Sequence, residues 1–172
     1  MKTLMAVLIG GGLGLAACDP APGSEIDCTP AAAPDGVSTE VPPSTAAALQ
    51  SWLANDGYAG FLGESADHGS TGPHGRVRTF VNAQLAGSLA DCAASHPVGA
   101  AAVKELYDAG AVAGWAVMIK TRPDAGADSW YWYEVFATEP DAAAAVSSQG
   151  SGSCTGCHDA GLDAVRSGWP LR

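Results

Sequence analysis

The chain has 172 residues and a formal net charge of −10, with 18 acidic and 8 basic side chains. This acidic balance argues against nucleic-acid binding and against docking on anionic membranes through basic patches. The N-terminus predicts export, because a short basic start, Met1-Lys2, precedes an apolar and glycine run over residues 4–15. A run of this length is too short for a comfortable membrane span and is typical of a signal peptide.

The signal ends in Leu15-Ala16-Ala17-Cys18, which resembles a bacterial lipobox. Such signals predict that residues 1–17 are removed and that Cys18 is acylated, giving an exported lipoprotein anchored to a membrane and facing the periplasm. The alternative is an ordinary signal peptide whose cysteine pairs in a disulfide. Residues 18–44 are rich in small and polar residues and in proline, so we expect a flexible tether there.

Residues 45–172 are expected to form one domain. Apolar side chains at helical spacing predict a helix over residues 45–55 with Ser44 as its N-cap, and Asn82 is placed to cap a second helix that ends at Ala90. Strands are predicted from β-branched and aromatic content at residues 77–81, 101–107, 115–121 and 130–136. The fold class that follows is α+β, an antiparallel β-sheet with flanking helices.

The strongest chemical signal is Cys154-Thr155-Gly156-Cys157-His158 near the end of the chain. Two thiols at this spacing can each add across a haem vinyl group, and the adjacent histidine can reach the iron. The motif predicts one covalent haem c, bound through Cys154 and Cys157, with His158 as the axial iron ligand. A thioredoxin-like pair needs a βαβ setting, a zinc site needs a further ligand, and a plain disulfide leaves the histidine unexplained.

Of the five cysteines, Cys28 and Cys92 remain when the lipid and haem cysteines are set aside. Export places them in an oxidising compartment, so a Cys28–Cys92 disulfide is predicted, with two unpaired thiols as the alternative.

The haem motif is expected to open a short terminal helix, and the residues after it include no Met or His. A sixth iron ligand, if present, therefore lies upstream. Met118 is expected in the core rather than at iron. The remaining histidines, His68, His74 and His96, lie in loops that contain Gly, Pro or Ser, where a solvated histidine is the common case.

From about Trp52 to its end, the chain resembles the cytochrome P-460 family, whose relatives include the β-sheet cytochromes c′ (cytochrome c′-beta). The segments that carry the resemblance are, in order, His74-Gly75-Arg76-Val77-Arg78-Thr79-Phe80-Val81-Asn82, Pro97-Val98-Gly99-Ala100, Val103-Lys104-Glu105, Met118-Ile119-Lys120, Trp130-Tyr131-Trp132 and the haem motif.

The resemblance implies a haem with one open face. P-460 members carry a lysine bound covalently to the haem ring, and the matching residue here is Lys104; the alternative is that Lys104 forms an ion pair. The family's distal acid lies just before the haem motif, where this chain has Gly-Ser-Gly-Ser, so Ser151 is the candidate distal group. Serine is a poor base, which puts proton abstraction in doubt. Phe61 and Phe80 are candidates for the apolar distal wall of the nitric oxide-binding relatives.

The function implied is that of a mono-haem c-type cytochrome of the periplasmic space that oxidises hydroxylamine, nitric oxide or both. Its partners would be that small nitrogenous ligand, a redox partner protein and, through the aromatic residues 130–133, a second copy in a homodimer. Two alternatives stay open. One is nitric oxide binding without turnover, as in cytochrome c′-beta, and the other is electron transfer with a sixth iron ligand.

Overall fold

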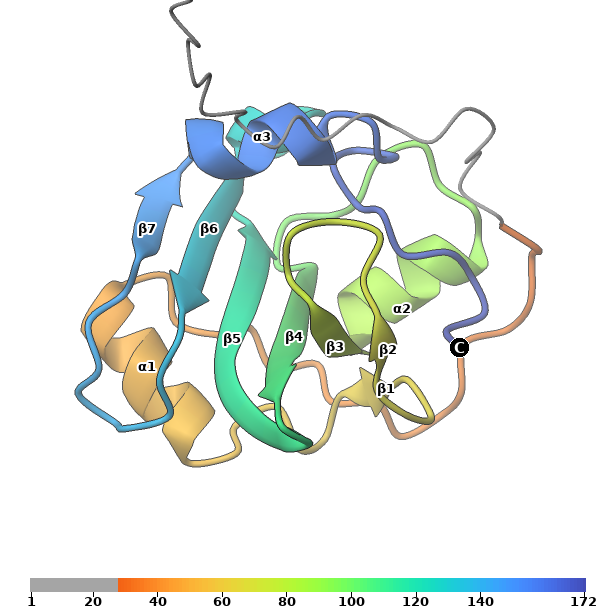
Figure 1. Cartoon of the computed structure of the whole chain (residues 1–172). Helices are drawn as coiled ribbons and strands as arrows, with labels where there is room; N and C mark the ends of the chain where they lie inside the picture. The colour runs from red at the N-terminus through yellow and green to blue at the C-terminus, as the bar shows by residue number, and fades with distance from the viewer. Residues whose placement is uncertain (1–27) are drawn as a thin grey trace, which may run out of the picture.

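The computed structural model describes residues 28–172. Within them it has a seven-stranded antiparallel sheet and three α-helices, the α+β class that the sequence predicts. The strands lie in the order β1-β3-β4-β5-β6-β7, and β2 also pairs with β3 (Figure 1). The predicted signal peptide, the lipidation at Cys18 and the first part of the expected tether lie outside the described residues.

The strands are β1 (Leu62–Gly63), β2 (His68–Gly69), β3 (Arg76–Val81), β4 (Ala101–Asp108), β5 (Ala111–Lys120), β6 (Trp130–Val135) and β7 (Val146–Gln149). The helices are α1 (Ala46–Ala54), α2 (Ala83–Ala90) and α3 (Gly152–His158), with a 3-10 turn, η1 (Ala127–Ser129). The four predicted strands correspond to β3, β4, β5 and β6. Strands β4 and β5 form a long hairpin that turns at Ala109 and Gly110, both with positive φ, as a two-residue turn between twisted strands requires.

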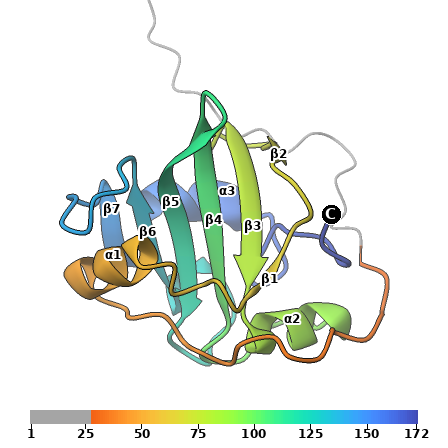
Figure 2. The same cartoon turned by 90° about the horizontal axis from the view of Figure 1, so that it is seen from below.

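Side chains alternate between the two faces of the sheet, and each face has its own apolar core. On one face, Leu49 and Leu53 of α1 pack on the sheet. On the other face, Leu85 and Leu89 of α2 pack in a cluster that contains Trp132. Helices α1 and α3 lie on opposite sides of the sheet (Figure 2). The haem motif therefore lies on the side away from α1.

The helix predictions are confirmed in place but not in every detail. Asn82 caps α2, because its side chain accepts a hydrogen bond from the backbone N–H of Leu85 at 3.1 Å. Ser44 does not cap α1; the N-cap is Thr45, whose side chain makes no capping hydrogen bond. The prediction that the haem motif opens a terminal helix is wrong, since α3 begins before the motif and ends with it at His158.

Residues 28–44 lie along the domain. Their backbone N–H groups donate to carbonyl oxygens of distant segments, in the pairs Thr29–Trp169, Ala31–Ala90 and Ser38–Gly60. This part of the expected tether is therefore docked. The composition of the segment gave no sign of docking, because many of its contacts are hydrogen bonds to its backbone carbonyl oxygens, such as those from Trp169 to Ala31 and from Asn82 to Glu40.

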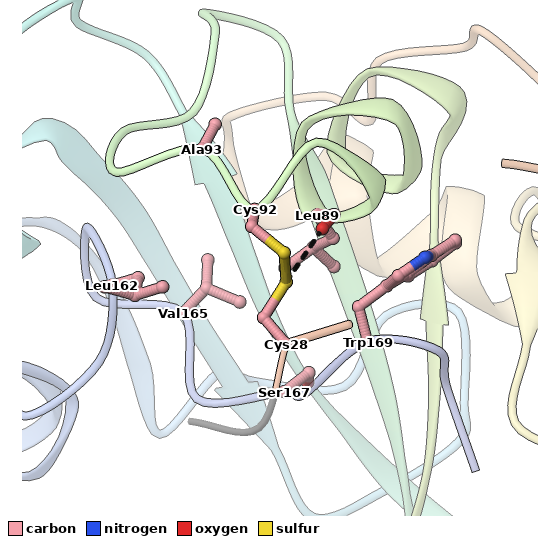
Figure 3. Close-up of a pocket in the computed structure, with 8 residues that line it drawn as sticks. All are labelled: Cys28, Leu89, Cys92, Ala93, Leu162, Val165, Ser167 and Trp169. Carbon is pink, nitrogen blue, oxygen red and sulfur yellow. Dashed lines mark hydrogen bonds between the residues drawn. A yellow bond between two sulfur atoms is a disulfide. The ribbon is translucent and has the colours of Figure 1, made fainter. Parts of the chain in front are cut away.

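The structure joins Cys28 to Cys92, the pairing that the cysteine count predicts. The bond links the N-terminal segment to the residues that follow α2, and Figure 3 shows Leu162, Val165 and Trp169 of the C-terminal segment beside it. A disulfide is consistent with an extracytoplasmic location. Among residues 28–172, no helix is long and apolar enough to cross a membrane.

Replacing both Cys28 and Cys92 with alanine should lower the free energy of unfolding by about 4 kcal/mol, because the bond closes a loop with a sequence separation of 64. Urea unfolding of the wild type and the double variant, each with and without a reductant, measures the difference. The reductant should destabilise the wild type more than the double variant, in which the bond of Cys157 is the disulfide that remains to be reduced. A double variant as stable as the oxidised wild type would show that the bond adds nothing to stability.

Candidate functional site

A cavity of about 420 Å³ lies on the sheet face opposite α1, a volume typical of small-molecule sites. Its floor contains Val77 and Thr79 of β3 and Lys104 of β4. The loop between β2 and β3, the end of α3 and the C-terminal residues 166–172 form its walls. The cavity therefore joins parts of the chain that are distant in sequence.

Three of the predicted site residues, Lys104, Cys157 and His158, line this cavity together. Cys154 and Ser151 do not line it. The two motif cysteines lie one helical turn apart on α3, so they face the same side of that helix. The hydroxyl of Ser151 lies 2.9 Å from that of Ser153, at the N-terminus of α3 and away from the cavity.

A hydrogen bond holds His158 in one tautomer. Its Nδ1 lies 2.8 Å from the carbonyl oxygen of Ala164, which can only accept, so Nδ1 carries the proton. Its Nε2 makes no hydrogen bond to any residue between 28 and 172. Burial, together with a smaller effect of the Lys104 charge, lowers the pKa of His158 to about 4, so the ring is neutral at pH 7. A neutral imidazole whose Nδ1–H is donated to a carbonyl is the usual axial or metal-binding form.

The His158 ring also packs edge-on against Trp132, with ring centroids 4.6 Å apart. Trp132 is itself held, because its indole N–H donates to the carbonyl oxygen of Ala127 at 3.0 Å. One of the aromatic residues that predict β6, Trp132, therefore also orients the ring of His158, the candidate iron ligand.

Lys104 lies in the middle of a cross-strand row. The register places Thr79, Lys104, Ala116 and Glu134 side by side on β3, β4, β5 and β6. Burial lowers the pKa of the Lys104 amine; the charge of Glu64 opposes this effect, and that of Arg166 adds to it. Its Nζ forms no ion pair or hydrogen bond with the described residues, so the alternative of an ion pair is not seen there.

Two hydrogen-bonded histidine–glutamate pairs lie at the cavity. His74 Nδ1 is 3.0 Å from Glu134 Oε1, and His68 Nε2 is 3.1 Å from Glu64 Oε2. The sequence patterns single out neither glutamate, since each pair depends on how the loop between β2 and β3 folds over the sheet. Arg166, which donates to the carbonyl oxygen of Cys157 at 3.0 Å, was also missed.

The other candidates for a sixth iron ligand lie elsewhere. Met118 is in the core, as expected. His96 is buried, not solvated, and its two ring nitrogens contact the Ser88 hydroxyl at 2.8 Å and the Leu162 carbonyl oxygen at 3.2 Å. It is buried because a distant segment of the chain covers the loop in which it lies.

Phe61 and Phe80 pack on the α1 side of the sheet. They therefore do not form a wall of this cavity, contrary to the expectation for a nitric oxide-binding relative. The reason is strand alternation: Val77 and Thr79 point toward the cavity, so the neighbouring position 80 points away.

The motif thiols are in different states. Cys154 is free, and burial raises the pKa of its thiol. Cys157 is disulfide-bonded. Thioether attachment at Cys157 therefore requires its reduced thiol. Within residues 28–172, no three His, Cys, Asp or Glu side chains are grouped to hold a metal ion directly.

No protein-family model matches the chain, and no curated protein and no solved structure is similar to it. The resemblance to the cytochrome P-460 family therefore stays an expectation.

Proposed function

We propose that this protein is a mono-haem c-type cytochrome that binds and oxidises a small nitrogenous molecule, hydroxylamine or nitric oxide, at an open haem face. The observation that carries the proposal is the state of His158. Its Nδ1 is committed to a backbone carbonyl, and its ring lines a cavity that also contains Lys104. This arrangement is what an axial histidine of a CxxCH motif needs.

The residues present suit a haem. The two motif cysteines are on one side of α3, where both thiols can form thioethers once Cys157 is reduced, and the neutral His158 follows directly. When bound, a haem supplies an iron centre that exchanges single electrons and coordinates a small ligand. Lys104, with its unpaired and partly desolvated amine, is the residue available for a covalent link to the ring.

Three of the four upstream candidates for a sixth iron ligand are engaged by other groups, whereas His74 lines the cavity with only its Nδ1 engaged. In the open-face proposal His74 contacts the bound ligand and does not coordinate the iron. Met118 and His96 are held in other parts of the fold. Both ring nitrogens of His68 are engaged, Nδ1 with the Gly69 carbonyl at 2.9 Å and Nε2 with Glu64. In this proposal the domain faces the periplasm on a lipid anchor at Cys18. Its net charge of −10 would favour a redox partner protein with a basic face.

Absorption spectra of the purified holoprotein, with added nitric oxide and with hydroxylamine plus an electron acceptor, test this function. We expect five-coordinate ferric and ferrous haem, nitric oxide binding by the ferrous form, and hydroxylamine turnover above that of free haem. A six-coordinate low-spin haem in both states would contradict the open face and indicate an electron carrier. Nitric oxide binding without turnover would reject the oxidase and leave a gas-binding protein.

Exchanging Lys104 for arginine should remove any covalent link to the ring while keeping a cation in the cavity. We expect the wild-type haem peptide to carry the peptide that contains residue 104, and the haem peptide of the variant to lack it. We also expect the ferrous Soret band of the variant to lie at the position found for an ordinary haem c. Peptide mass spectrometry and the ferrous spectrum measure both effects. Identical spectra and peptide masses before and after the exchange would mean that Lys104 is not linked.

A further inference from the structure

We propose that His74, oriented by Glu134, is the proton acceptor of this cavity and takes a proton from the N–H or O–H group of a ligand bound there. The inference rests on the proposed function for the position of the ligand. Its own evidence is the geometry of the His74–Glu134 pair, which neither the sequence patterns nor the resemblance indicates.

The pair is held by two separate parts of the fold. His74 is in the loop that joins β2 to β3, and Glu134 is on β6, on the far side of β4 and β5. The loop therefore reaches over the cross-strand row that contains Lys104 and the small Ala116. Both side chains are shielded, with 18% and 19% of their surfaces exposed. The 3.0 Å contact between Nδ1 and Oε1 is consequently shielded from solvent, and His74 is the member of the pair that lines the cavity.

The hydrogen bond sets the tautomer of His74. An ionised carboxylate only accepts, so Nδ1 must carry the proton and, in the neutral ring, Nε2 carries the lone pair. This Nε2 has no hydrogen-bond partner in residues 28–172, and the ring lines the cavity. A carboxylate that orients a histidine in this way is the usual arrangement for a histidine that acts as a base.

The other polar groups of the cavity are less suited to accept a proton. Glu64 Oε2 already accepts from the Thr79 backbone N–H at 2.6 Å and contacts His68 Nε2 at 3.1 Å. His158 is reserved for iron, and Ser151 lies outside the cavity. His74 is therefore the candidate proton acceptor, because the residues directly before the haem motif include serines but no carboxylate.

The proposed step is a proton transfer. An N–H or O–H bond of the ligand breaks, its electron pair stays on the ligand, and the proton forms an N–H bond at His74 Nε2. The resulting imidazolium is stabilised by the adjacent Glu134 carboxylate. When the Lys104 amine is protonated, its positive charge destabilises the imidazolium and stabilises the anionic ligand.

Hydrogen cyanide is a suitable probe, because it binds ferric haem as its anion and must lose a proton. The association rate would be measured on the ferric holoprotein. His74→Gln should bind cyanide about 100-fold more slowly than the wild type, because it lacks the base that takes the proton of hydrogen cyanide. Glu134→Gln, which keeps an amide oxygen for Nδ1, should slow binding about tenfold. His68→Gln is the matched control, with a change of less than about twofold, because both of its ring nitrogens are already engaged.

Equal cyanide association rates in the wild type and His74→Gln would overturn the role of His74. If His74→Gln fails to fold or to carry haem, Glu134→Gln decides: an unchanged rate in that variant would overturn the proposal. Failure of the proposed function is seen separately, as a wild-type protein that carries no covalent haem.

Discussion

Exchanging Asp163 for alanine is expected to lower the free energy of unfolding by about 3–5 kcal/mol, the cost of breaking a buried ion pair. The Asp163 carboxylate accepts from Lys120 Nζ at 2.6 and 2.7 Å, and both side chains are fully shielded from solvent. It also accepts from the backbone N–H groups of His96 and Gly126. The variant would leave the Lys120 charge buried without its carboxylate, which urea unfolding at neutral pH would measure.

Two comparisons make this result specific. Asp67→Asn removes a carboxylate from an exposed pair with Arg76 and should cost less than about 1 kcal/mol. The double variant Lys120→Met/Asp163→Leu should be more stable than Asp163→Ala, because it removes both charges and fills the volume. A loss in Asp163→Ala no larger than that in Asp67→Asn would show that the pair does not hold the domain together.

The same carboxylate predicts a loss of stability in acid. Burial raises the pKa of Asp163, but hydrogen bonds from His96, Lys120 and Gly126 outweigh it, so the pKa lies below its ordinary value. Its contribution is fully present above the unfolded-state value of about 3.9 and is lost as the pH falls through the lower folded-state pKa. Burial also lowers the pKa of His96, which adds a separate loss below about pH 6.5. Urea unfolding of the wild type and Asp163→Asn below about pH 4 measures the part of the carboxylate. At higher pH the two proteins also differ at His96, because the Asp163 charge raises the pKa of that ring.

The second large effect is expected at His158. Exchange for alanine removes the proposed iron ligand, and the yield of haem-loaded protein should fall at least about tenfold, since even the loss of an outer-shell partner costs 10- to 100-fold in metal affinity. Haem content per protein, from absorbance and mass, is the measurement. Added imidazole should restore the five-coordinate spectrum of any haem that remains, because a free imidazole can replace the missing ring.

His68→Gln is the matched variant for His158→Ala, since it removes another histidine of the same cavity and should keep full haem content. A His158→Ala protein with wild-type haem content and an unchanged spectrum would show that His158 does not ligate the iron.

The sheet was largely predictable from local sequence, because its strands are rich in β-branched and aromatic residues, as in Trp130–Val135. Strand ends were less so: β5 begins at Ala111, before the apolar stretch, because the turn at Gly110 continues the hairpin. The short strand β2 lies in a stretch that composition marks as a loop. It forms because His68 and Gly69 pair with β3.

The candidate site was only partly predictable. The haem motif is local, so Cys154, Cys157 and His158 could be read directly from their spacing. That Lys104 lines the same cavity followed from the resemblance alone. Glu64, Glu134 and Arg166 could not be found, because their positions depend on strand register and on the fold of two loops.

Mass spectrometry of the C-terminal peptide that contains residues 154–158 tests the central claim most directly. The protein would be taken from cells that attach haem to exported cytochromes, and digested without a reductant. The account predicts one haem joined by two thioethers, to Cys154 and to Cys157. A peptide without haem, with a free Cys154 thiol and Cys157 held in a disulfide, would contradict it.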